Sequence, residues 1–133
     1  MKRLISLSAI LLVGVLFMAG CRGANVYNVV EAPIPTTQKV SNDKIFKAIK
    51  AAGRSLGWNV KKLKNGEAKA SINVRGKHTA VVQITYNQKS YSINYLNSQN
   101  LKYDEEKNTI HKNYNSWIMN LDRAIQFELD SIE

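Results

Sequence analysis

Residues 67–95 read EAKASINVRGKHTAVVQITYNQKSYSINY, and the alternation of apolar and polar side chains along this stretch decides the fold. From 68 to 74 and from 80 to 86, every second residue is alanine, valine, isoleucine or tyrosine. A third run alternates in the same way from 90 to 95. A period of two is typical of β-strands that bury one face. Because the connections between the runs are short, we expect the strands to pair antiparallel as a meander.

The residues before this stretch extend the sheet. Trp58-Asn59-Val60 leads to Asn65-Gly66, a dipeptide that is the strongest short-range signal for a β-hairpin. A strand is therefore predicted before this hairpin, which makes four strands in all. The short apolar patch at 26–30 could add a further strand at the edge of the sheet.

Two amphipathic helices flank the strands. The first is predicted over 41–57, with an N-cap at Ser-Asn and a glycine at its end. Gly53 lies inside this helix, where the missing side chain allows close packing on the sheet. The second helix is predicted from about 109 to 129, after a polar loop at 97–108. Its apolar stripe consists of Ile110, Tyr114, Trp117, Leu121, Ile125 and Leu129.

These patterns predict an α+β fold with the element order α-β-β-β-β-α. The expected architecture is a two-layer sandwich in which two helices cover one face of a four-stranded antiparallel meander. A chain of 133 residues suits a single domain, which we expect to occupy residues 39–133.

The first 20 residues have the organisation of a secretory signal peptide. Two basic residues come first, residues 4–17 are mostly apolar, and Ala19-Gly20 supplies small residues at a cleavage point. A retained transmembrane anchor is the alternative, and it needs about 20 apolar residues. Because the apolar stretch is shorter and Arg22 follows at once, we predict a signal peptide over residues 1–20.

The single cysteine follows this segment. Residues 17–21, FMAGC, resemble the lipobox of bacterial lipoproteins, although methionine stands at 18 where leucine is usual. The resemblance implies lipid on the Cys21 thiol and cleavage before Cys21, whereas the alternative for a lone cysteine is a small buried hydrophobe. Arg22, in place of aspartate, implies export to the outer membrane with the domain facing the periplasm. Residues 21–38, which include two prolines, are expected to form a lipidated tether.

Two short sequence segments near the C-terminus show a second resemblance. Residues 95–101 read YLNSQNL and residues 110–117 read IHKNYNSW. Together they resemble a group of small, uncharacterised Gram-negative lipoproteins in which such a loop precedes a His-x-x-Tyr-x-x-Trp helix start. The resemblance implies a family and no activity. In element order the domain is also similar to the accessory lipoproteins of the outer-membrane barrel-assembly machine, a similarity of fold alone.

The same region supplies a first candidate site. His111 and Asn115 are four residues apart at the start of the predicted helix, and with Trp117 and Tyr103 they could line a cleft. Aromatic and amide side chains together can stack on and hydrogen-bond a peptide or a sugar. In the structural alternative, His111 and Asn115 cap the helix and fasten the loop, while Trp117 is core. We regard these four residues as candidates for contact with a protein partner.

A second candidate site is basic. It comprises Lys47, Lys50, Arg54, Lys61, Lys62 and Lys64. The first three share the exposed face of the predicted helix, and the other three lie near the hairpin. Anionic lipid headgroups or an anionic envelope polymer would fit this charge, and a solubilising surface is the alternative. Secretion argues against nucleic acid as the partner.

The sequence favours binding over catalysis. It contains no Ser/His/Asp spacing, no carboxylate pair on an apolar face, no phosphate-cradling glycine loop and no group of metal ligands, and it implies no cofactor. The predicted function is a lipid-anchored, non-catalytic binding or assembly module with an envelope protein as its partner. The alternative is a binding module for anionic envelope lipid or polymer through residues 44–64.

Overall fold

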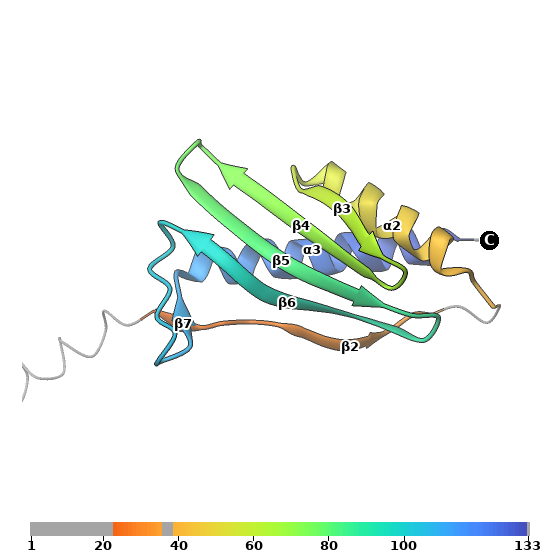
Figure 1. Cartoon of the computed structure of the whole chain (residues 1–133), viewed down its shortest axis with the longest axis horizontal. Coiled ribbons are helices and arrows are strands. Elements are labelled where there is room, and N and C mark those ends of the chain that lie inside the picture. Colours follow the sequence, from red (N-terminus) through yellow and green to blue (C-terminus); the bar gives the residue numbers. More distant parts are fainter. Residues whose placement is uncertain (1–22, 36–38, 133) are drawn as a thin grey trace, which may run out of the picture.

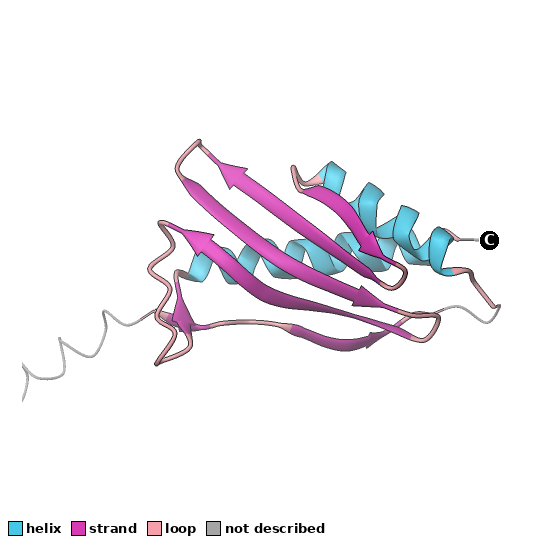
Figure 2. Ribbon diagram, in the orientation of Figure 1, coloured by secondary structure: helices cyan, strands magenta, loops and turns pink. Residues whose placement is uncertain are grey.

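The computed structural model describes residues 23–35 and 39–132, which form an α+β fold (Figures 1 and 2). Two helices pack together on one face of a five-stranded antiparallel sheet, and a two-stranded sheet lies at one end. The elements are β1 (Ala24–Asn25), β2 (Val29–Pro33), α2 (Asn42–Ser55), β3 (Asn59–Lys64), β4 (Glu67–Val74), β5 (His78–Tyr86), β6 (Ser90–Gln99), β7 (Thr109–Ile110) and α3 (Lys112–Asp130). None of the helices in these ranges is both long and apolar enough to cross a membrane.

The main sheet confirms the predicted meander. Its strand order is β2-β6-β5-β4-β3, so β3 pairs antiparallel with β4, β4 with β5, and β5 with β6. Strand β6 runs to Gln99, three residues into the predicted loop, and carries a β-bulge that interrupts the alternation after Tyr95. Val81 lies opposite Asn97 and Val82 lies opposite Tyr95, which leaves Leu96 as the extra residue.

The predicted apolar faces form the core between sheet and helices. The alternating residues Ala68, Ala70, Ala80, Val82 and Ile84 are completely buried. Helix α2 follows its prediction closely, because Ser41 Oγ accepts the Lys44 N–H at 3.3 Å as the N-cap. Close helix–sheet packing at Gly53 is confirmed as well. A Cβ at this position would lie 2.5 Å from Val60 Cγ2.

The second helix differs from its prediction in two respects. It begins at Lys112 instead of 109, because Thr109 and Ile110 form β7 and pair with β1. Its buried face contains Ile118, whereas Trp117 is only partly buried. Both positions lie three or four residues from the buried residues Tyr114 and Leu121, so spacing alone did not distinguish them.

The expected tether is the largest difference. Within residues 21–38, β1 pairs with β7, and β2 pairs with β6 at the edge of the sheet. The edge strand anticipated at 26–30 is thus present, but it spans Val29–Pro33. Val29 and Ile34 are buried, and the open edge of β6 supplies hydrogen-bond partners that a free tether would lack. The predicted signal peptide and Cys21 lie outside the described residues.

Candidate functional site

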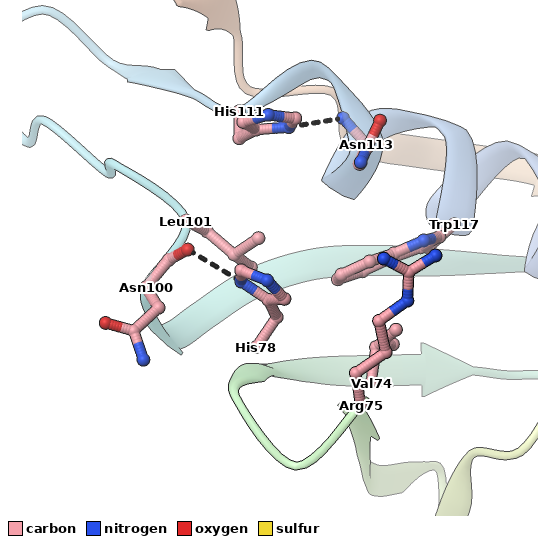
Figure 3. A pocket seen from close by; sticks show the side chains of 8 residues that line it. All are labelled: Val74, Arg75, His78, Asn100, Leu101, His111, Asn113 and Trp117. Carbon is pink, nitrogen blue, oxygen red and sulfur yellow. Dashed lines mark hydrogen bonds between the residues drawn. The ribbon is translucent and has the colours of Figure 1, made fainter.

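A cavity of about 230 Å³ opens at the end of the sheet where β4 and β6 stop and α3 begins (Figure 3). Its lining residues are Val74, Arg75, His78, Asn100, Leu101, His111, Asn113 and Trp117. They come from the β4–β5 turn, the end of β6 and the first turns of α3. The chain has two histidines, and both line this cavity.

The β4–β5 turn brings Arg75 to the cavity. Lys77 N donates to Val74 O at 3.2 Å, and the two residues between them, Arg75 and Gly76, have φ values of 57° and 68°. Positive φ at both central positions is characteristic of a type I′ turn, for which asparagine followed by glycine is the preferred pair. Arg75 and Trp117 both line the cavity (Figure 3).

Asn100 fastens this turn to the end of β6. Its side-chain amide donates to Lys77 O at 2.7 Å, and its carbonyl lies 2.9 Å from Nδ1 of His78 (Figure 3). Because a carbonyl oxygen can only accept, His78 Nδ1 is the donor. The other ring nitrogen of His78, Nε2, is therefore the one available to a ligand.

His111 is the N-cap of α3. Its Nδ1 accepts the Asn113 N–H at 3.1 Å, and its own N–H donates to Leu101 O at 2.8 Å. With Nδ1 acting as an acceptor, the neutral ring carries its proton on Nε2. Histidine Nε2–H, the Asn113 amide and the positive N-terminal end of α3 all favour an acceptor group with negative charge.

The electrostatics of this end are mixed but leave the cavity positive. None of the described residues that line it is acidic. The neighbouring segments carry Lys77, Lys102 and Lys112. An acidic run, residues 104–106, lies in the turn before β7 and does not line the cavity. The site can therefore bind a small anionic or hydrogen-bond-accepting group next to an aromatic ring.

The four residues proposed for a protein partner do not form one cluster. His111 and Trp117 line the cavity. Asn115 instead fastens the N-terminal segment, donating to Asn25 O at 2.8 Å and accepting the Tyr27 N–H at 3.0 Å. Tyr103 stacks on Tyr95 with 4.2 Å between ring centroids.

Sequence reasoning missed the other half of this site. It did not propose Arg75, His78 or Asn100, although His78 is the chain's other histidine and the turn at 75–76 departs from the preferred Asn-Gly. These two signals would have identified the turn. The distance between this turn and the start of α3 could not have been predicted from the sequence, because it depends on the register of the whole meander.

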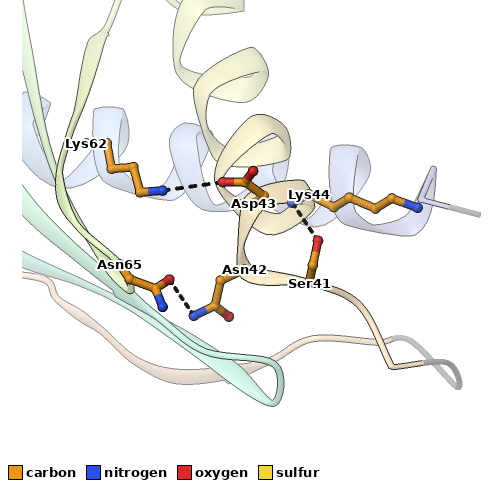
Figure 4. A network of polar contacts seen from close by, with 6 residues as sticks. All are labelled: Ser41, Asn42, Asp43, Lys44, Lys62 and Asn65. Atoms are coloured by element: carbon orange, nitrogen blue, oxygen red, sulfur yellow. Dashed lines mark hydrogen bonds and ion pairs between the residues drawn. The ribbon is translucent and has the colours of Figure 1, made fainter.

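The six basic residues of the second candidate site are all exposed, and they divide between two elements. Lys47, Lys50 and Arg54 lie on α2, whereas Lys61, Lys62 and Lys64 lie on β3. Two of them form ion pairs at the surface: Lys62 with the exposed Asp43 at 3.3 Å (Figure 4), and Lys64 with the partly buried Glu67 at 3.3 Å. Such pairs contribute about 0–1 kcal/mol each.

Hydrogen bonds join the β3–β4 hairpin to the start of α2. Asn42 Nδ2 donates to Asn65 Oδ1 at 3.0 Å, next to the Lys62–Asp43 pair (Figure 4). This end of the molecule lies opposite the end that holds β1, β7 and the cavity (Figure 1).

Comparisons with known proteins give no family. The chain matches no protein-family model and no curated protein. Among the described residues there is no group of three histidine, cysteine, aspartate or glutamate side chains that could hold a metal ion.

Proposed function

We propose that the protein is an outer-membrane lipoprotein of a Gram-negative bacterium, anchored through lipid on Cys21. Its domain faces the periplasm and acts as a non-catalytic binding or assembly module for another envelope protein. The lipobox resemblance at 17–21 and the similarity of 95–117 to small lipoproteins support this proposal. So does the chemistry of the cavity, whose guanidinium, imidazole, amide and indole groups are suited to recognition.

The observation that carries the proposal is the pairing of β1 with β7. Ala24 lies opposite Ile110, so the described chain begins at the cavity end of the molecule (Figure 1). Cys21 lies two positions before Gly23 in the sequence, and two residues of chain span at most about 7 Å. A lipid on Cys21 would hold this end at the membrane and direct the opposite end, with the Asn65-Gly66 hairpin, into the periplasm.

The alternative, an anionic ligand for the basic residues, is favoured by one contact. Lys61 lies directly opposite Lys69 in the β3–β4 pair, and like charges in this position repel each other. An anionic partner would relieve that repulsion. Because these lysines lie away from the N-terminal end, the partner that fits is an anionic envelope polymer or an acidic protein surface.

Replacing Cys21 with serine tests the anchor. We expect the wild-type protein to incorporate labelled palmitate and to sediment with the outer membrane. Cys21→Ser should incorporate no label and keep its first 20 residues, because a hydroxyl cannot take the place of the thiol in lipid transfer. Met18→Leu, which restores the usual lipobox residue, is the control and should match the wild type. A Cys21→Ser chain that is cleaved and sorted normally would refute the anchor.

Photocrosslinking in cells tests the protein partner. A photoreactive residue at Tyr103, which is partly exposed beside Tyr95, is expected to give one discrete adduct whose partner is identified by mass spectrometry. Phe127, an exposed aromatic residue near the other end of α3, is the matched control and should give none. The same adducts at both positions, or none at Tyr103, would argue against a specific partner at this surface.

A further inference from the structure

We propose that the cavity between the β4–β5 turn, the end of β6 and the start of α3 binds the phosphate of an anionic phospholipid headgroup. The lipid belongs to the membrane that carries the anchor. This inference rests on the proposed lipid on Cys21 for its location, and on the cavity itself for its chemistry.

The lining groups complement a phosphodiester. Arg75 offers a planar guanidinium group, which binds phosphate through two parallel hydrogen bonds. Nε2–H of His111 and the side-chain amide of Asn113 are further donors. A phosphodiester offers only acceptor oxygens, so it matches a cavity lined by these donors and by no carboxylate.

The size of the cavity favours a headgroup over a lipid chain. Its volume of about 230 Å³ is below the range of roughly 300–1,000 Å³ typical of sites for drug-sized ligands. A phosphate with part of a glycerol fits such a space, whereas acyl chains do not. The indole of Trp117 gives the site one apolar wall for the glycerol carbons.

The path of the N-terminal segment brings the cavity close to lipid. Ile110 pairs with Ala24 and immediately precedes His111, a lining residue. A Cβ on Gly23 would lie 3.1 Å from Ile110 O, so the chain is in direct contact with β7 before it leaves the described region. With the anchor only two residues further, headgroups are held at high local concentration, and a weak intrinsic affinity suffices for occupancy.

Two features bear on the choice of ligand. A carboxylate from a protein partner would match the same donors, but only a lipid phosphate is brought to the site by the anchor. The acidic residues 104–106 repel a negatively charged membrane surface. The basic residues Lys102 and Lys107 flank them at the same end of the molecule.

A substitution at Arg75 can distinguish an effect on ligand binding from an effect on folding. In a turn with positive φ at both central positions, asparagine before glycine is more favourable than arginine. Arg75→Asn is therefore expected to fold at least as stably as the wild type. If Arg75 has a role only in the turn, this substitution should leave ligand binding unchanged.

The experiment uses the full lipidated protein in a phosphate-free detergent, with the histidine rings followed by NMR. Both histidines line the cavity, so the ring signals report on this site alone. Dihexanoyl phosphatidylglycerol, added below its micelle concentration, is expected to shift both rings saturably. Arg75→Asn should weaken this binding at least tenfold and leave the melting temperature unchanged or higher. Lys89→Gln, which removes one exposed positive charge from the β5–β6 turn outside both candidate sites, should bind as the wild type does.

Each other outcome overturns the proposal in a distinct way. Unshifted histidines, or unchanged affinity in Arg75→Asn, would show that the cavity does not bind the headgroup. Inorganic phosphate binding as tightly as the lipid would indicate a site for free phosphate. Tighter binding of a peptide with a free C-terminal carboxylate would indicate a protein ligand. Palmitate labelling at Cys21 is measured separately, so failure of the anchor is distinguishable from failure of the cavity.

Discussion

Replacing Gly53 with valine is expected to lower the free energy of unfolding by about 3 kcal/mol, in the upper part of the range for overpacked cores. Even the first added carbon, Cβ, would lie 2.5 Å from Val60 Cγ2 and 3.3 Å from Trp58 Cβ. Val60 is buried and its branched side chain has little rotational freedom, so α2 must move away from β3. Urea denaturation followed by far-UV circular dichroism measures the loss.

Two further variants check this explanation. Ala51→Val introduces the same residue at an exposed position of the same helix, where only helix propensity changes, and should cost about 0.5 kcal/mol. Val60→Ala removes the obstructing methyl group, so Gly53→Ala should cost less in that background than in the wild type. A Gly53→Val protein within about 0.5 kcal/mol of wild-type stability would contradict the close approach of helix and sheet.

Replacing Tyr91 with phenylalanine is expected to cost about 2 kcal/mol. The Tyr91 ring is buried, and its hydroxyl donates to Asp122 Oδ1 and accepts from Gln126 Nε2 at 2.7 Å. Phenylalanine keeps the packing but leaves both α3 side chains without this partner. Hydrogen bonds to charged groups are worth about 1.5–3 kcal/mol. Thermal and urea denaturation should both show the loss.

A neighbouring tyrosine provides the matched control. Tyr86 lies directly opposite Tyr91 in the β5–β6 pair and is also buried, but its hydroxyl has no hydrogen-bond partner among the described residues. Tyr86→Phe should therefore be neutral or stabilising, because it removes an unsatisfied buried hydroxyl. Equal losses in the two variants would show that packing, and not the hydrogen bonds, accounts for the cost.

The same tyrosine predicts an alkaline limit to stability. Burial raises the pKa of Tyr91, and the hydrogen bond to Asp122 and its charge raise it further, while burial also raises the pKa of Tyr114. In the unfolded chain these groups ionise at about pH 10. Their contribution is therefore complete below pH 10 and is lost as the pH rises above it, by about 1.4 kcal/mol per pH unit for each tyrosine. Tyr91→Phe should show a shallower alkaline loss than the wild type.

Most of the sheet and both helices could be predicted from the sequence, because local patterns determine them. Alternation at 68–74 and 80–86 specified which side of each strand is buried, and the N-cap at Ser41 specified where α2 begins. The error at 117–118 arose because both positions satisfy helical spacing. The tether was expected because two prolines exclude a helix, but proline is tolerated in an edge strand, and Pro33 ends β2.

The candidate site was only half predictable. His111 and Trp117 belong to one short sequence motif, so they could be predicted from the local sequence. Arg75 and Asn100 are 25 residues apart in sequence numbering, and they meet because β5 and β6 return the chain to the same end of the sheet. Asn115 had the right residue type for recognition, but the backbone of residues 25–27 already occupies its amide.

Strand β2 also determines how the domain responds to force. The chain enters at the β1–β7 end, follows β6 along the edge of the sheet, and reaches Lys89 O through the Ile34 N–H at 2.9 Å. A pull on the amino terminus, directed outward along β2, loads the β2–β6 hydrogen bonds in shear. In this geometry the hydrogen bonds share the tension and must break together. If the strand were pulled away sideways, the same hydrogen bonds would break one at a time. With the lipid proposed for Cys21, tension from a membrane would therefore meet a mechanically resistant attachment.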